Sequence, residues 1–409
     1  MDLFAGMPYW PDTVPDRPRY EALQGDADCD VVIVGAGSSG AQTAYQLTKA
    51  GLNVVLLDKR QPGTGSTAVN TALLQYAGEK SFVTLKNAFG ETAAVRHFKL
   101  CSAAIDEMEA VCKELPFNPQ FTRRNSLYYA SKPEDTAQLQ DEYRLLRKHG
   151  FDVEWWAADR ITARFPFRSA AALYYRNDAE MNPYAYTIGL LELAKERGAR
   201  VYGDTAVTGR HAHDGGIELR TAQGFTVRAL QAVYASGYEC LDVKPTPNAS
   251  MVSSYSVVTE PVGDLSSWHG RSLIWETARP YIYMRTTPDN RIIVGGLDEP
   301  ITDADERDVK LTRKIALLLE EFRKRFPDIP VKPGHGVAAF YGGTHDGLPM
   351  IGRFPELPRC FFLYGYGDNG LVYGQVLSRI IRDLLATGES TDADLYLHTR
   401  PLLSRTVPV

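Results

Sequence analysis

The sequence predicts an α/β fold in which a second domain is inserted between the pieces of the first. Strand-like and helix-like runs alternate along the chain, and one early strand runs directly into three closely spaced glycines, DVVIVGAGSSG at residues 30–40. The chain has 409 residues, of which 44% are hydrophobic, so it can bury the cores of about two domains.

Composition excludes several classes of function. Fifty acidic residues against 45 basic ones give a formal net charge of −5, so there is no overall basic field, and nucleic acid is not an expected partner. Five cysteines without a CxxC pair favour free, buried thiols in the cytoplasm. The N-terminus lacks the basic start and apolar run of a signal peptide, and no apolar stretch reaches the length of a membrane span.

The N-terminal half begins with an arm and a β-α-β unit. Residues 1–27 are rich in proline and aromatic residues and are predicted to be extended, with regular structure starting at Asp30. A strand over 31–34, a helix over about 40–50 and a strand over 53–58 form the β-α-β unit. Apolar residues at a spacing of three to four then predict a long helix over about 91–115.

Further elements follow the same alternation. Helices are predicted at 134–149 and 184–197 and strands at 126–130 and 230–236. Residues 282–296 predict a hairpin, with turn residues at Pro288, Asp289 and Asn290. A helix from Leu311 to Phe326, a strand at 361–364 and a final apolar helix complete the chain.

The predicted domains are discontinuous. The cofactor-binding domain comprises 28–88, 160–245 and 335–390, and the substrate domain comprises 89–159 and 246–334. We expect the second domain to be α+β, built on an antiparallel or mixed sheet. The arm at 1–27 and a tail at 391–409 lie outside both domains.

The glycine-rich turn predicts a dinucleotide site. Gly35, Gly37 and Gly40 fit G-x-G-x-x-G: the first makes a tight turn, the second admits a pyrophosphate, and the third lets the helix pack on the strand. Asp58 ends the second strand at the spacing of about 20 residues where a carboxylate binds ribose hydroxyls. These features do not choose between NAD and FAD.

Six segments, taken in order, resemble one family. They are PYWPDTVP, GAGSSG with LLDKR, GTGST, the segment at 181–209, VYASGYE at 233–239, and the pair THDGLPMIG at 344–352 with GYGDNGLVYG at 365–374. In these segments the sequence resembles the D-amino acid oxidase superfamily of FAD enzymes, on the glycine oxidase, sarcosine oxidase and γ-glutamylputrescine oxidase side. The resemblance implies a Rossmann-type FAD-binding domain beside the substrate domain.

The resemblance also implies which residues hold FAD. The turn Gly35–Gly40 would bind the pyrophosphate, Asp58 the ribose, and Val207 the adenine, while the run 365–371 would face the isoalloxazine ring. The full set is Gly35, Gly37, Ser38, Ser39, Gly40, Asp58, Lys59, Ser66, Thr67, Val207, Ser236, Gly237, Gly367, Asp368, Asn369, Gly370 and Leu371. Two alternatives stay open: Lys59 as a solvated charge and Val207 as a core residue.

In this family a hydride passes from the carbon next to a nitrogen to flavin N5, giving an imine that water hydrolyses. The expected substrate is therefore an amine or amino acid, with O2 as the acceptor, and no strong catalytic base is required. An apolar pocket would favour the neutral amine that reacts. Candidates for its walls are Tyr255, Tyr281, Tyr283 and Tyr341.

Three departures from the relatives, at four positions, affect the substrate prediction. Ala339 falls where sarcosine oxidases carry the cysteine that bonds to flavin, so we expect non-covalent FAD. Tyr341 and Val372 replace positive residues of glycine oxidase and sarcosine oxidase, which leaves Arg285, Arg123 or Arg124 as candidates to bind a substrate carboxylate.

Asp368 is the third departure, because it replaces a glycine of the final turn. It either caps the last helix or receives a cationic amine. His335 and His345 lack acidic partners at metal-binding spacing, so no metal site is predicted.

Three other functions remain open: an FAD-dependent dehydrogenase of another substrate class such as a hydroxy acid, passing electrons to a carrier; an NAD dehydrogenase; and a dinucleotide-binding module without catalysis.

Overall fold

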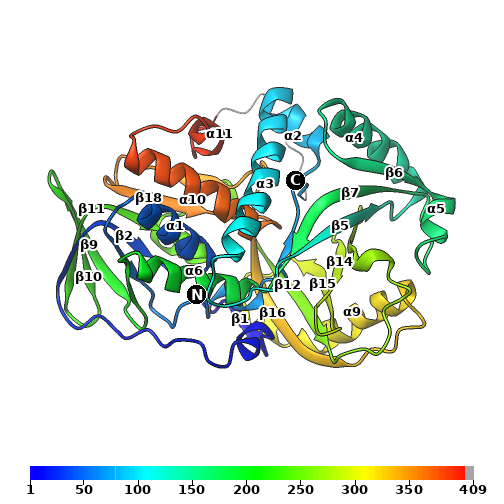
Figure 1. The fold of residues 1–409 in the computed structure, drawn as a ribbon, viewed down its shortest axis with the longest axis horizontal. Coiled ribbons are helices and arrows are strands. Elements are labelled where there is room, and N and C mark those ends of the chain that lie inside the picture. Colours follow the sequence, from blue (N-terminus) through cyan, green and yellow to red (C-terminus); the bar gives the residue numbers. More distant parts are fainter. Residues whose placement is uncertain (79, 401–409) are drawn as a thin grey trace.

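The computed structural model describes residues 1–78 and 80–400, and two large sheets lie side by side in it (Figure 1). The last nine residues of the predicted tail, 401–409, lie outside the described residues. The predicted α/β fold, with a Rossmann-type sheet and a second mixed sheet, is confirmed.

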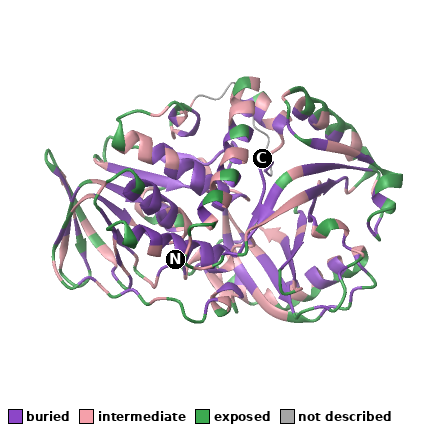
Figure 2. Ribbon diagram, viewed as in Figure 1, coloured by how far each residue is buried: buried purple, intermediate pink, exposed green. Residues whose placement is uncertain are grey.

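The first sheet has a parallel centre. β18, β11, β2, β3 and β8 pair in that order and in parallel, while β17 and β10 add antiparallel strands, and β9 extends β10. Its eight strands are β2 (Ala27–Val34), β3 (Val54–Leu57), β8 (Arg200–Tyr202), β9 (Val207–His213), β10 (Gly216–Thr221), β11 (Thr226–Tyr234), β17 (Met350–Gly352) and β18 (Cys360–Tyr364). β3 and β18 are buried throughout, and β2 and β11 are mostly buried toward their carboxyl ends, as expected for a sheet covered on both faces (Figure 2).

Three helices pack together against this sheet. α1 (Ser38–Lys49) lies against both α6 (Pro183–Glu196) and α10 (Gly370–Ala386), and α3 (Glu91–Cys112) packs on α10. The inner face of α1 carries the small residues Gly40, Ala41 and Ala44, which are buried and allow close approach to its neighbours. This packing fixes the N-termini of α1 and α10 relative to the sheet.

The second sheet is mostly antiparallel, with β13 and β5 paired in parallel. Its order is β1-β16-β12-β15-β14-β13-β5-β7-β4, and β6 pairs with β7. The ten strands are β1 (Phe4–Gly6), β4 (Leu73–Leu74), β5 (Thr122–Tyr129), β6 (Val153–Ala157), β7 (Ala171–Glu180), β12 (Ala249–Thr259), β13 (Leu273–Glu276), β14 (Ile282–Thr286), β15 (Ile292–Glu299) and β16 (Pro333–Thr344).

Helices also cover the second sheet. α9 (Leu311–Arg325) packs on β12, β15 and β16, and α4 (Thr136–Lys148) packs on β6 and β7. The shorter helices are α2 (Phe82–Phe89), α5 (Ala158–Thr162), α7 (Cys240–Val243), α8 (Ala304–Asp308) and α11 (Ala393–Tyr396), with 3-10 turns at Trp10–Thr13, Ser66–Val69, Pro133–Asp135, Gly237–Glu239 and His269–Arg271.

The long periodic elements agree with the predictions, and the N-terminal arm requires a correction. The predicted helices, the hairpin β14–β15 and the last strand are present with shifts of a few residues at their ends. Residues 4–6, however, form β1 on the edge of the second sheet, paired with β16, and β2 starts at Ala27 rather than after Asp30. Pairing with a strand more than 300 residues away leaves no local signal in the sequence.

Some segments predicted for the cofactor-binding domain belong to the second sheet. β4 and β7 fall within 28–88 and 160–245, and nearly all of β16 falls within 335–390, yet all three strands pair in the ten-stranded sheet. The chain therefore crosses between the two sheets at other points than predicted: between β3 and β4, between β7 and β8, and between β16 and β17.

The carboxyl ends of four parallel strands meet at one edge. Val34 pairs with Leu57 on one side and with Tyr234 on the other, and Tyr234 pairs with Phe362. The turns that follow β2, β3, β11 and β18 therefore converge there, as ligand-binding turns do in parallel sheets.

The cysteines are all free. Within residues 1–78 and 80–400, no helix combines the length and apolar character needed to cross a bilayer.

Candidate active site

The glycines after β2 have different structural roles. Gly35 has a φ of +104°, and a Cβ atom there would lie 2.7 Å from the Ala235 carbonyl oxygen. A Cβ atom on Gly40 would lie 1.9 Å from the Gly35 carbonyl oxygen, so Gly40 permits the close packing of α1 on β2. On Gly37 a Cβ atom would meet only Thr67 Oγ1, at 3.1 Å, so this glycine leaves room for a ligand.

Asp58 holds the turn together. Its Oδ2 atom accepts a hydrogen bond from the Ala36 N–H at 2.7 Å, and its Oδ1 atom accepts one from the Arg60 N–H at 2.8 Å. Burial raises the pKa of Asp58, while these two backbone donors act in the opposite direction. The carboxylate lines a cavity and keeps further lone pairs for ligand hydroxyls.

A larger cavity of about 330 Å³ runs along the edge where the strands end. Most of the residues predicted to bind FAD line it: Gly35, Gly37, Ser38, Ser39, Asp58, Lys59, Ser66, Thr67, Val207, Ser236, Gly237 and Gly370. Five do not line it: Gly40, Gly367, Asp368, Asn369 and Leu371. Lys59 Nζ lies 2.9 Å from Glu239 Oε1, so this charge is paired rather than only solvated.

The N-terminus of α10 has no side-chain cap from its N-cap residue, Asn369. The Asn369 amide instead accepts from the Gln75 N–H at 3.2 Å and donates to the Ala77 carbonyl at 3.3 Å. Asp368 precedes the N-cap position, which belongs to Asn369, and its Oδ1 atom accepts from the Tyr373 hydroxyl at 3.4 Å. The free N–H groups and the positive end of the helix dipole at the start of α10 can therefore attract a negatively charged part of a bound group. The two predicted roles of Asp368, capping this helix or receiving a cationic amine, stay predictions.

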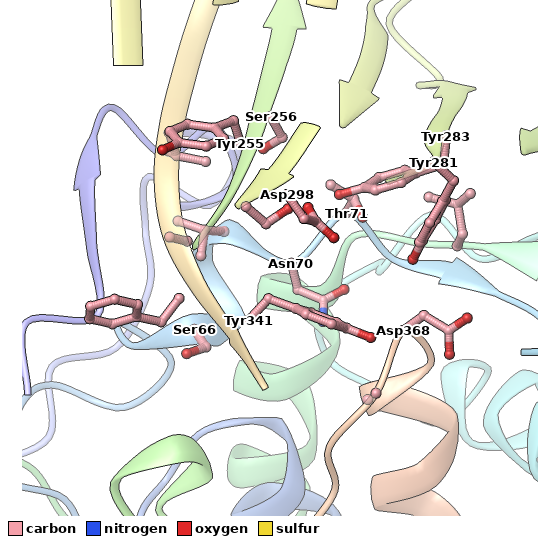
Figure 3. Close-up of a pocket in the computed structure, with 18 of the residues that line it drawn as sticks. Ser66, Asn70, Thr71, Tyr255, Ser256, Tyr281, Tyr283, Asp298, Tyr341 and Asp368 are labelled. Carbon is pink, nitrogen blue, oxygen red and sulfur yellow. The ribbon is translucent and has the colours of Figure 1, made fainter. Parts of the chain in front are cut away.

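A smaller cavity has a volume of about 130 Å³, and Figure 3 shows residues that line it. Its aromatic walls are Tyr238, Tyr255, Trp275, Tyr281, Tyr283, Phe340 and Tyr341. Asp298, Gly367, Asp368 and Ala339 also line it. The four tyrosines predicted to line the substrate pocket are therefore brought together.

Several lining residues were not predicted, among them Asn70, Thr71, Tyr238, Trp275 and Asp298. The sequence held one signal for Asp298: two adjacent glycines inside the strand IIVGGLDE, which are typical of a bulge.

The two cavities share lining residues. Ser66, Asn70, Tyr238 and Gly370 contribute to both, so a ligand lying in the larger cavity can reach the smaller one. Burial raises the pKa of Tyr255 to about 12 and raises the pKa of Tyr283 further. At neutral pH these two side chains are neutral hydroxyls, which position ligands rather than remove protons.

Arg285 does not fit the predicted role of a carboxylate clamp. Its guanidinium is fully buried, donates to the carbonyls of Thr71 at 2.6 Å and Met181 at 2.8 Å, and lies 3.7 Å from Glu180. It does not line the smaller cavity. Arg285 follows Tyr283 by two residues on β14 and so shares its face of the sheet, but the carbonyls of Thr71 and Met181 hold its guanidinium outside the cavity lining.

The other two candidate clamps are also engaged elsewhere. Arg123 pairs with Glu109 at 2.6 Å, and Arg124 pairs with Glu180 at 2.9 Å. His335 lies 3.4 Å from Asp12. Within the described part of the chain, no group of three His, Cys, Asp or Glu side chains could hold a metal ion.

A glycine cradle at the end of a parallel strand, a carboxylate after the next strand and a cavity leading to a second helix N-terminus define a dinucleotide-dependent oxidoreductase. Residues 30–384 match the family described as FAD dependent oxidoreductase (DAO). The chain belongs to this family, and it is an FAD-dependent oxidoreductase.

The relatives include amine and amino acid enzymes. Gamma-glutamylputrescine oxidoreductase of Escherichia coli (strain K12) is 25% identical over 90% of this chain and 85% of its own length. Glycine oxidase from Geobacillus kaustophilus has a solved structure that superposes with a TM-score of 0.76 and 22% identity, covering 93% of this chain and 100% of that one.

A third relative is matched over a shorter stretch. The Bacillus subtilis (strain 168) protein YhfW, whose name assigns it to the Rieske 2Fe-2S iron-sulfur proteins, is 30% identical over 48% of this chain. The match covers 38% of that relative's length.

The residues of the larger cavity fit FAD. The open space at Gly37, the Asp58 carboxylate and the N-terminus of α1 suit an ADP group, and the uncapped start of α10 suits the electron-rich end of a flavin. None of the five cysteines lines either cavity in the described part of the chain.

Proposed function

We propose that this protein oxidises the C–N bond of an amine or amino acid to an imine, with O2 as the electron acceptor. The observation that carries this proposal is the continuity of the two cavities through Ser66, Asn70, Tyr238 and Gly370. A substrate in the smaller cavity would lie next to the end of the larger cavity where α10 begins. Bound FAD would supply the two-electron oxidation.

The chain itself binds and orients the substrate. Aromatic rings from β12, β13, β14 and β16 would exclude water and hold the reacting carbon in place. The start of α10, with Gly370 in both cavities, would place positive potential at the flavin. No nucleophile or base triad is needed for this step.

The cofactor would be held without a covalent bond. The resemblance to sarcosine oxidases puts Ala339 where those enzymes carry the flavin-linking cysteine, and Ala339 lines the smaller cavity. A cytoplasmic location is part of the proposal, and the five free cysteines support it.

The test is anaerobic visible spectroscopy of the purified holoenzyme. We expect amines or amino acids to bleach the flavin absorbance and air to restore it with release of hydrogen peroxide. Bleaching by hydroxy acids alone, without rapid reoxidation by air, would support the dehydrogenase alternative instead. If no compound of the panel bleached the flavin, the result would support the alternative of a dinucleotide-binding module without catalysis.

A further inference from the structure

We infer that the substrate is an amine carrying a second cationic group, which pairs with Asp298, and that the oxidised carbon bears no carboxylate. This inference rests on the proposed function and names the substrate class of the same site.

The charged residues that line the smaller cavity have one sign. Among the described residues, Asp298 and Asp368 line it, and no lysine, arginine or histidine does. A substrate ammonium is attracted to such a lining, whereas a substrate carboxylate is repelled by it. Recognition of an α-carboxylate normally uses a guanidinium in direct contact.

Cations near the cavity are engaged elsewhere. Lys310 and Lys314 lie 3.2 and 3.1 Å from Glu299. Arg279 packs over the Tyr281 ring and donates to the carbonyl of Ala278 at 2.8 Å. None of these three residues lines the cavity, and Arg285 does not line it either.

Arg307 is the strongest competing candidate for a carboxylate partner. Its guanidinium stacks on Phe340 at 4.4 Å, pairs with Asp308 at 2.6 Å and donates to the Asp2 carbonyl at 3.1 Å. Phe340 lines the cavity, whereas Arg307 does not.

A bulge in β15 places Asp298. Tyr255 pairs with Gly296 and Ser253 with Glu299, so three steps along β15 oppose two along β12. Gly296 has a φ of +128° and Leu297 a φ of +58°, a backbone conformation that costs leucine about 1 kcal/mol or more. Bulges re-aim side chains next to active sites.

The surroundings of Asp298 suit an ammonium. Its Oδ1 atom is buried from solvent, which strengthens its pairing with a cation. Figure 3 shows Asp298 in the middle of the labelled side chains, with Tyr281 and Tyr283 to one side and Tyr341 below. Aromatic faces add cation–π attraction for the same kind of group.

Two features set the length of the substrate. Asp368 and Gly370 mark the wall next to α10, while Asp298 comes from β15 on the second sheet. An amine to be oxidised beside α10 therefore needs its second cation a short chain away. A cavity of about 150 Å³ holds benzene, so the smaller cavity, at about 130 Å³, suits a molecule of roughly six heavy atoms.

The test uses three amines of one chain length that differ at the far end: diaminobutane, butylamine and aminobutanoate, with glycine added. Binding to the holoenzyme is measured by calorimetry without oxygen, and flavin bleaching is followed in parallel. We expect diaminobutane to bind about 10-fold more tightly than butylamine, and aminobutanoate and glycine to bind most weakly.

Variants assign the effect to Asp298. In Asp298→Asn, diaminobutane should lose about 10-fold in affinity, while butylamine changes less than about 3-fold. Asp305→Asn removes the same charge at an exposed position on α8 and should change neither. FAD content and thermal unfolding show whether each variant is folded.

Three results would overturn the inference: tighter binding of glycine or aminobutanoate than of the diamine, which would point to Arg307; equal binding of diamine and monoamine by the wild type; or unchanged selectivity in Asp298→Asn. Selective binding of the diamine without flavin bleaching would refute the proposed oxidation and leave the Asp298 site standing. Bleaching by amines without any preference for the diamine would support the proposed oxidation and refute the Asp298 site.

Discussion

The Asp58 carboxylate accepts a hydrogen bond from the backbone N–H of Ala36, with a distance of 2.7 Å between Oδ2 and N. One side chain thus joins the end of β3 to the glycine turn after β2. Both segments line the larger cavity through Asp58, Gly35 and Gly37, so the same carboxylate shapes the turn and faces the cofactor.

Replacing Asp58 should weaken FAD binding. Asp58→Ala removes the partner of Ala36 and the acceptor for the ribose, and hydrogen bonds to charged groups contribute about 1.5–3 kcal/mol, so we expect a loss of about 10- to 100-fold in FAD affinity. Fluorescence titration of the apoprotein measures it. Asp28→Asn, at an exposed position of β2, is the control, and equal affinities in the two variants would contradict the assignment.

Two glycine substitutions should separate packing from cofactor binding. Gly40→Ala places Cβ 1.9 Å from the Gly35 carbonyl oxygen and should lower the free energy of unfolding by about 2–3 kcal/mol. Gly37→Ala meets only the Thr67 hydroxyl, so the apoprotein should unfold at nearly the wild-type temperature yet bind FAD more weakly. Thermal unfolding with and without FAD compares them; a Gly37→Ala protein with normal FAD affinity would show that Gly37 does not face the cofactor.

Arg285 should matter for stability rather than for substrate choice. Arg285→Met leaves Glu180 without one of its two arginine partners in the core, and breaking a buried pair costs about 3–5 kcal/mol. Chemical denaturation measures this loss. If the folded variant lost affinity for amino acid ligands but kept its stability, Arg285 would instead bind the substrate carboxylate.

Asp178 should make stability depend on pH. It is fully buried, accepts hydrogen bonds from Ser126 and from the Tyr76 N–H, and burial raises its pKa from 3.8 to about 7. The folded protein therefore binds more protons than the unfolded chain between about pH 4 and 7, so the Asp178 contribution to stability falls as pH rises through this window.

Asp178→Asn removes this titration. The decrease in unfolding free energy between pH 5 and pH 8 should become smaller in the variant, by at most about 2.7 kcal/mol, because about two pH units of this range lie below the folded pKa. Urea unfolding at several pH values measures it. Glu142, whose pKa burial also raises to about 7, remains in both proteins, so some dependence persists. Identical pH profiles for the two proteins would show that Asp178 does not titrate in this range.

The sequence by itself determined the cofactor half of the site. The turn from Gly35 to Gly40, the strand ending at Asp58 and the turn before α10 are each contiguous, and their backbone chemistry can be predicted from a few neighbouring residues. Parallel strands bring their carboxyl ends to one edge, so these local motifs converge without further information.

Only the tertiary structure decided the substrate half. Asn70, Tyr238, Trp275 and Asp298 come from separate elements, and their meeting depends on strand order, register and the bulge at Gly296 and Leu297. The same dependence turned Arg285 from a candidate ligand-binding residue into a buried ion-pair partner. A side chain's face in a strand changes with a register shift of one residue, and register is set by long-range pairing that no local pattern specifies.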